Sequence, residues 1–126
     1  MIFYNENNEI IDHNKMEIDE QNLVKKYIKN DDIVLELGAR YGTVSCAINE
    51  KLEFVKNQVV VEPDKRVWEA LKNNMIRNNW NFHIVNGFLS KKKITLTNLD
   101  CYKGGYGSKN KNDLGSKIDC FSLDEI

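Results

Sequence analysis

The 126-residue sequence contains no long apolar run, one proline and only three cysteines. No stretch approaches the roughly 20 apolar residues that a membrane-spanning helix requires, and the polar, acidic start from Asn5 to Glu9 is unlike a signal peptide. Cys46, Cys101 and Cys120 are far apart, and no pair has the spacing of a metal or redox motif. We therefore expect reduced thiols, no metal site, no membrane association and a cytoplasmic location.

An excess of charge of either sign is also absent. Eighteen basic and nineteen acidic residues give a formal net charge of −1, which provides no electrostatic reason to bind nucleic acid. The hydrophobic share of 41% and the charged share of 29% are ordinary for a globular chain. The length suits one compact unit with its own core. We therefore predict a single domain, residues 1–126, that binds a small molecule and no nucleic acid.

Strand and helix patterns alternate through the middle of the sequence. Short apolar runs have the length and the β-branched content of buried strands, and we expect the first of them to be buried on both faces. Amphipathic helical patterns separate these runs, with Thr43 or Ser45 available to cap the first of the two helices. The strands and helices follow in the order 33–37, 43–52, 59–62, 63–75 and 82–85. This order implies an α/β fold with a parallel sheet, built on a βαβαβ core at residues 32–90.

The two ends of the chain are patterned differently from this core. Residues 1–18 alternate loosely around an Asn-rich turn, which indicates a weak hairpin or an extended arm. A short amphipathic helix follows from Asp19 to Ile28. Residues 91–126 predict a β-hairpin, with strands at 93–99 and 118–123 joined by a long polar loop. We expect that loop to be mobile.

The segment from Glu36 to Gly42 lies between a predicted strand and a predicted helix. Gly38 and Gly42 stand four positions apart, and glycine permits a tight turn and a close approach of ligand to backbone. Arg40 replaces the middle glycine of the dinucleotide fingerprint, so a pyrophosphate cradle for NAD is disfavoured. The Glu36 carboxylate would favour a cationic ligand group over an anion. Alternatively, Glu36 caps a helix or pairs with Arg40.

Polar residues also end the second and third predicted strands. Glu62 stands 26 positions after Glu36, and a carboxylate at this strand end can accept hydrogen bonds from both hydroxyls of a ribose. Asn86, Gly87 and Phe88 follow the third strand, where an amide, a bare backbone and an aromatic ring can bracket an adenine. Asn86 could equally satisfy the backbone of a turn.

Other residues that could take part in binding or catalysis do not form a recognisable motif. Trp68 and Trp80 flank helical or turn segments, and we expect them to pack in the core or at its rim. His83 lies inside a predicted strand, where a satisfied core residue is the expected role. The sequence offers no Ser/His/Asp set, so a hydrolase has no support.

The loop and strand ends resemble those of the class I S-adenosylmethionine-dependent methyltransferases, and most nearly the FkbM-like branch, from about residue 32 onward. The matching segments are Val34 to Gly42 for the cofactor loop, Val60 to Asp64 for the ribose strand and Phe121 to Ile126 for a later strand. The resemblance implies a Rossmann-like parallel sheet with flanking helices that binds S-adenosylmethionine over its first strands. The implied cofactor-binding residues are Glu36, Gly38, Ala39, Arg40, Tyr41, Gly42, Glu62, Pro63, Asn86, Gly87 and Phe88.

The resemblance also implies methyl transfer, often to oxygen, with a sugar, glycan or other small molecule as the acceptor. Gly105 and Tyr106 lie in a glycine-rich loop that could bind this acceptor or merely end a long hairpin. In the family, the next strand carries an acidic residue near the transferred methyl group and would begin after Ile126, so no catalytic residue is assigned. We therefore expect a C-terminally truncated class I domain, and the alternative function is a noncatalytic cofactor-binding module or partner subunit.

Truncation at this point would affect assembly. The strand at 33–37 would lie at an open edge of the sheet, and open edges pair with strands of other chains. We therefore expect a homo-oligomer, or a partner chain that completes the sheet. A strictly monomeric mass in solution would contradict this expectation.

Overall fold

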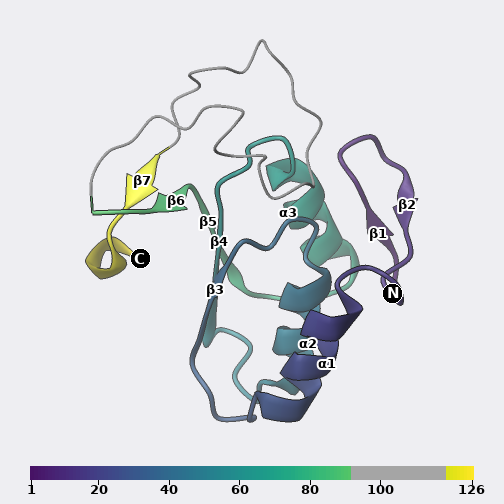
Figure 1. Cartoon of the computed structure of the whole chain (residues 1–126), viewed down its shortest axis with the longest axis horizontal. Coiled ribbons are helices and arrows are strands. Elements are labelled where there is room, and N and C mark those ends of the chain that lie inside the picture. The colour runs from purple at the N-terminus through teal and green to yellow at the C-terminus, as the bar shows by residue number, and fades with distance from the viewer. Residues whose placement is uncertain (92–118) are drawn as a thin grey trace.

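The computed structural model describes residues 1–91 and 119–126, which form an α/β fold (Figure 1). Three parallel strands make the central sheet, in the order β3 (Val34–Leu37), β4 (Gln58–Glu62) and β5 (His83–Asn86). The helices are α1 (Ile18–Tyr27), α2 (Thr43–Lys51) and α3 (Trp68–Arg77). The predicted α/β class, parallel pairing and order of elements are thus confirmed.

All three helices pack on one face of the sheet (Figure 1). Val34, Val60 and Ile84 project from this face, because alternate side chains of a strand point the same way and the strand register keeps these positions in phase. Val60 packs in a core cluster with Leu71 of α3, and Val34 packs against Ile48 of α2. Ile48 and Leu71 therefore lie on the inward faces of α2 and α3, as the amphipathic patterns predict.

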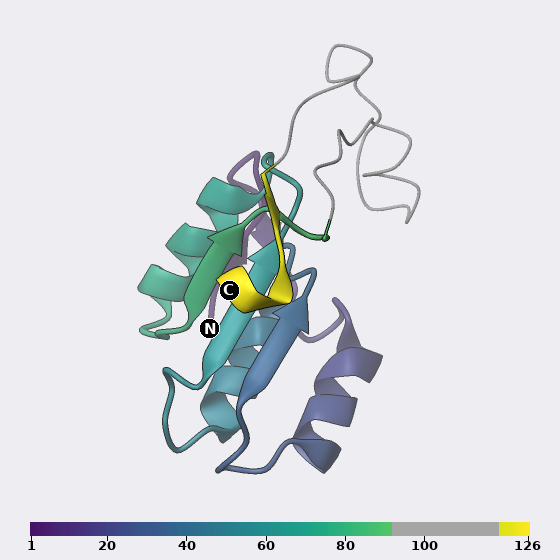
Figure 2. The same ribbon diagram turned by 90° about the vertical axis from the view of Figure 1, so that its left-hand side faces the viewer.

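The described residues leave the opposite face of β3 uncovered, as the view onto the sheet shows (Figure 2). Ile33, Leu35 and Leu37 are 84%, 39% and 59% exposed. The prediction that this strand is buried on both faces is therefore wrong, because no α-helix among the described residues lies on that side. Among those residues, β4 is also the one strand that pairs with β3, so the expected open edge is present.

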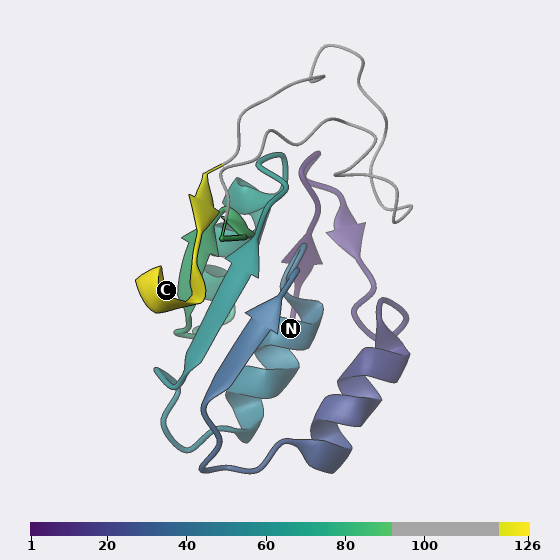
Figure 3. The same ribbon diagram turned by 60° about the vertical axis from the view of Figure 1, so that its left-hand side comes forward.

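A short parallel pair follows the central sheet. β6 (Phe88–Leu89) comes directly after β5 and pairs with β7 (Cys120–Phe121), beside the carboxyl end of β4 (Figure 3). A 3-10 turn at Leu123–Glu125 ends the chain. Part of the predicted strand at 118–123 is therefore present, but its partner is β6 and their pairing is parallel. The other hairpin strand, predicted at 93–99, lies outside the described residues, as does the loop.

Gly87 explains why β7 takes this partner. A Cβ atom at Gly87 would lie 2.5 Å from the Asp119 carbonyl oxygen and 2.6 Å from the Phe121 ring. Only a glycine allows the two backbones to approach so closely. The hydrogen bond from Phe88 N to Asp119 O, at 2.8 Å, then begins the pairing.

The N-terminal residues form the hairpin that was one of two predicted alternatives. β1 (Phe3–Tyr4) and β2 (Ile10–Ile11) pair in antiparallel fashion, and β1 lies beside α3 (Figure 1). Phe3 is buried and its ring stacks on Trp80, with 5.9 Å between the ring centroids. Trp80 thereby has the packing role expected from the sequence.

The helices differ in detail from the sequence prediction. α1 buries Val24 but leaves the apolar side chains of Leu23 and Tyr27 exposed, so the helix predicted from Asp19 to Ile28 buries only part of its apolar surface. The N-cap of α2 is Gly42, which has no side chain to cap the helix, and the Thr43 hydroxyl, one of the two predicted caps, instead donates to Glu17 Oε1 at 2.8 Å. None of the described helices is long and apolar enough to cross a membrane.

Candidate functional site

A pocket of about 280 Å³ opens at the carboxyl ends of β3 and β4. Its lining residues are Leu37, Gly38, Val61, Pro63, Gly87, Phe88 and Leu89. Four of these, Gly38, Pro63, Gly87 and Phe88, were predicted to bind a cofactor. Open parallel sheets bind ligands at the carboxyl ends of their strands, so this pocket is the candidate site.

Sequence reasoning missed the apolar side of this pocket. Leu37 and Val61 are paired in the β3–β4 register and project from the face opposite the helices. Alternation along the strands would have placed them together, because Glu36 and Val60 point the other way. Strand alternation therefore predicts that Leu37 and Val61 share a face, but only when the register between β3 and β4 is known.

The loop from Gly38 to Gly42 forms one wall of the site. Gly38 has a φ of +84°, and a Cβ atom built there would meet nothing within 4 Å. Gly42 has a φ of +92°, but a Cβ atom there would lie 3.0 Å from Leu71 Cδ1. The backbone conformation of both positions favours glycine. Gly38 faces open space, whereas Gly42 allows α2 and α3 to pack.

Glu62 fastens this loop to the end of β4. Its side chain is buried, and its two carboxylate oxygens accept hydrogen bonds from Arg40 N at 2.6 Å and Asp64 N at 2.8 Å. Burial raises the pKa of Glu62, and the two backbone N–H groups partly offset this effect. Glu62 does not line the pocket, but each carboxylate oxygen has a second lone pair, so a ligand hydroxyl that reached it would add to the loop contacts.

The Arg40 side chain lies along the same loop. Its Nη1 is 3.7 Å from Asp64 Oδ2, and its Nη2 donates to Tyr41 Oη at 3.1 Å. The guanidinium also covers the Tyr41 ring, 4.8 Å from the ring centroid. Arg40 is therefore not among the residues that line the pocket, and it helps to hold the loop between Asp64 and Tyr41.

Ala39 and Tyr41 are buried behind the loop. Ala39 belongs to the same core cluster as Val60, and Tyr41 packs with Val67 and Ala70. Neither residue lines the pocket. Their predicted ligand contacts would therefore have to come from backbone atoms.

Glu36 lies on the face of the sheet that the helices cover. Gln58 Nε2 donates to its Oε2 at 3.4 Å. Burial raises the pKa of Glu36 to about 7, although the Ser45 and Gln58 side chains partly offset the effect, and the Glu17 and Glu62 carboxylates add to it. Glu36 is thus near the loop but does not line the pocket.

We predict that Glu36→Gln flattens the pH dependence of stability. The folded state favours the protonated carboxyl, so the contribution of Glu36 is complete below pH 4.5 and is lost as the pH rises to about 7. This difference in pKa corresponds to about 3 kcal/mol. Chemical unfolding of both proteins at pH 5 and pH 8 measures the effect, and the variant should gain relative stability at pH 8. An unchanged pH dependence would contradict the buried position of this carboxyl.

Asn86 is separated from the other predicted adenine contacts. It is exposed and lines a groove of about 260 Å³ with Trp68 and His83, between α3 and β5. Trp68 Nε1 donates to Glu62 O at 2.7 Å, so this ring has a packing role at the rim. His83 is exposed, and its predicted place in the core is wrong because alternation along β5 turns it away from the helices.

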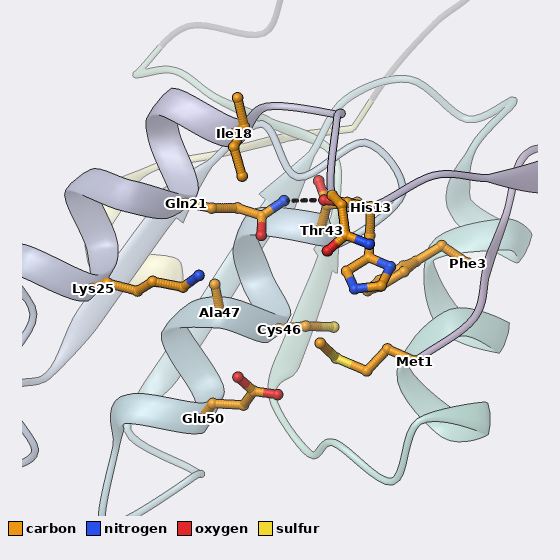
Figure 4. Close-up of a pocket in the computed structure, with 11 residues that line it drawn as sticks. Met1, Phe3, His13, Ile18, Gln21, Lys25, Thr43, Cys46, Ala47 and Glu50 are labelled. Atoms are coloured by element: carbon orange, nitrogen blue, oxygen red, sulfur yellow. Dashed lines mark hydrogen bonds between the residues drawn. The ribbon is translucent and has the colours of Figure 1, made fainter.

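A smaller cavity of about 110 Å³ lies between the N-terminal segment, α1 and α2 (Figure 4). Phe3, His13 and Cys46 form part of its wall, and burial raises the pKa of the Cys46 thiol. Gln21 Nε2 donates to the backbone oxygens of His13 and Met16 at 2.8 Å each. These bonds attach the segment that follows the hairpin to α1.

The predicted acceptor loop cannot be located in the fold. Gly105 and Tyr106 lie outside the described residues. Within residues 1–91 and 119–126, no group of three His, Cys, Asp or Glu side chains is arranged to hold a metal ion.

Comparison with known proteins adds no relative from which a function could be taken. No protein-family model matches the chain, and no curated protein sequence matches it. The function is therefore inferred from the geometry of the pocket and its loop.

Proposed function

We propose that this chain is the cofactor-binding part of a class I, FkbM-like methyltransferase with a Rossmann-like fold, and that it binds S-adenosylmethionine. One observation carries the proposal: the positive-φ loop at Gly38 and the residues after β4 and β5 meet at one pocket. These are the positions at which an open parallel sheet binds a nucleotide-like ligand.

The chemistry of the surrounding residues supports this ligand. The apolar lining and the Phe88 ring suit an adenine base, and the spare lone pairs of Glu62 suit a ribose. The carboxyl groups of Glu17, Glu36 and Glu62 lie behind the loop, outside the pocket lining, and when ionised they favour a cationic ligand over a pyrophosphate. S-adenosylmethionine carries a sulfonium and an ammonium group, whereas NAD carries a pyrophosphate.

The reaction that fits is transfer of a methyl group to a hydroxyl of a sugar or another small metabolite. The bound cofactor supplies an electrophilic methyl group. The protein orients that group and the acceptor in line, which is a proximity effect. The loop held by Glu62 would position the cofactor for this purpose.

Calorimetric titration of the purified chain with S-adenosylhomocysteine, with NAD as the control ligand, tests the proposal. We expect micromolar binding of S-adenosylhomocysteine and no binding of NAD. A folded chain that binds neither ligand would contradict cofactor binding, and binding of NAD alone would indicate a dinucleotide-binding protein.

The open edge of β3 favours a second candidate, a noncatalytic partner subunit. Leu35 and Leu37 are exposed beside backbone groups that no described strand pairs with, and such edges recruit strands from other chains. Sedimentation of the chain measures this: a mass above that of the monomer, without cofactor binding, supports the subunit role. A strictly monomeric mass would contradict the subunit role.

A further inference from the structure

Asn74 of α3 joins the N-terminal hairpin to the candidate loop. This side chain is 0% exposed. Its Nδ2 donates to Tyr4 O at 2.9 Å and to Tyr41 O at 3.0 Å, while its Oδ1 accepts from Tyr4 N at 2.9 Å and from Arg77 Nη1 at 3.0 Å. An amide has two donor hydrogens and two acceptor sites. All of them are used, and two segments far apart in sequence meet at one side chain.

Asn78, one helical turn later, makes the same contact with the hairpin but does not reach the loop. Its Oδ1 accepts from Ile2 N at 3.2 Å and its Nδ2 donates to Ile2 O at 2.9 Å. The second hydrogen of Nδ2 goes to Asn74 O within the helix. The two asparagines therefore act toward β1 as the edge of a neighbouring strand would, and only Asn74 extends this contact to Tyr41.

The turn of the hairpin makes a second contact with the loop. The Tyr41 hydroxyl donates a short hydrogen bond to the Glu6 carboxylate. Burial and this bond raise the pKa of Tyr41 to about 12, so the hydroxyl stays protonated and able to donate. The turn itself is rigid, because Asn5 Oδ1 accepts from the backbone N–H groups of Asn7 and Glu9 at 2.9 Å each.

The loop needs such support because its backbone is strained. Arg40 has a φ of +50°, which is unfavourable for a residue with a side chain. Strained positions persist where the surroundings fix them. Glu62 fixes Arg40 N from one side, and Asn74 and Glu6 fix the next residue, Tyr41, from the other.

We propose that the N-terminal hairpin is a positioning element of the ligand site, acting through Asn74 and Glu6 to hold the loop from Gly38 to Gly42 in its binding conformation. Displacement of the hairpin would release Tyr41 and weaken the site without touching the pocket lining. The identity of the ligand rests on the proposed function, whereas the coupling between hairpin and loop does not.

Two matched pairs of variants test the coupling. Asn74→Ala removes contacts with both the hairpin and the loop, whereas Asn78→Ala removes contacts with Ile2 and with the backbone of α3 but none with the loop. Glu6→Ala removes the bond to Tyr41, and Glu9→Ala removes a carboxylate of the same turn that accepts from Asn5 Nδ2 at 2.7 Å. Glu6 and Glu9 are exposed, so this second pair folds even if the buried Asn74→Ala variant does not.

Hydrogen exchange of the Arg40 and Gly42 amides is measured together with S-adenosylhomocysteine affinity. We expect Asn74→Ala and Glu6→Ala each to speed loop exchange and weaken binding about tenfold, the effect of losing one hydrogen bond to a charged or buried group. Asn78→Ala and Glu9→Ala should change neither. Equal loop exchange within the Glu6 and Glu9 pair would overturn the proposal. Faster exchange in a chain that binds no ligand would uphold the coupling and reject the proposed function.

Discussion

Replacement of Gly38 by leucine is expected to weaken S-adenosylhomocysteine binding about 100-fold and to leave the chain folded. A Cβ atom there meets nothing within 4 Å, so the new side chain fits the fold but enters the space proposed for the ligand. A 100-fold loss of affinity corresponds to about 3 kcal/mol of binding free energy, which is within the cost of overpacking a site. Calorimetric titration measures the affinity, and circular dichroism reports the fold.

The backbone strain of this change needs its own control. Leucine at a φ of +84° costs about 1–2 kcal/mol of stability wherever it stands. Asn79 has a φ of +60° and is exposed after α3, outside the pocket lining. Asn79→Leu should therefore lower stability similarly and leave the affinity intact. Global unfolding of Gly38→Leu alone would identify a purely structural glycine.

Glu62→Ala is expected to lower both the free energy of unfolding and the affinity for the cofactor. The variant leaves Arg40 N and Asp64 N without their acceptor, and a lost bond to a charged group costs about 1–3 kcal/mol. A similar loss of binding energy is expected if the carboxylate also holds the ribose. Urea unfolding and titration with S-adenosylhomocysteine measure the two effects separately.

Glu62→Gln separates the structural role from the ligand role. The amide keeps one acceptor oxygen for Arg40 N but places a donor group toward Asp64 N, so stability should fall less than in the alanine variant. Unchanged affinity in both variants would show that Glu62 does not contact the ligand and only holds the loop by hydrogen bonds.

Sequence periodicity predicted the strands and helices of the central fold, because each of them follows from a pattern of neighbouring residues. Val59 to Val61 form an apolar run long enough for a strand, and the Ala70 and Leu71 positions mark a helical face. The burial of β3 was not predictable in this way. An apolar run from Ile33 to Leu37 looks the same whether one face or both are covered, since coverage depends on layers contributed by distant parts of a chain.

The sequence predicted only those residues of the site that carry a local signal. Gly38 and Phe88 line the pocket as expected, because glycine and strand-end positions carry their own signal. Asn86 was assigned to the same ligand but lines a different groove, because strand alternation turns it toward the opposite face. The role of Asn74 carries no local signal, since its partner Tyr4 is 70 positions away.

The uncovered face of β3 also has a thermodynamic consequence. The heat-capacity increment of unfolding and the denaturant m-value both scale with the apolar surface that becomes exposed. Leu35 and Leu37 are already partly in water in the folded chain, so they contribute less to either quantity than residues of a sheet covered on both sides. Within residues 1–91 and 119–126, the exposure of these two leucines accordingly makes stability vary less steeply with temperature than burial of both would.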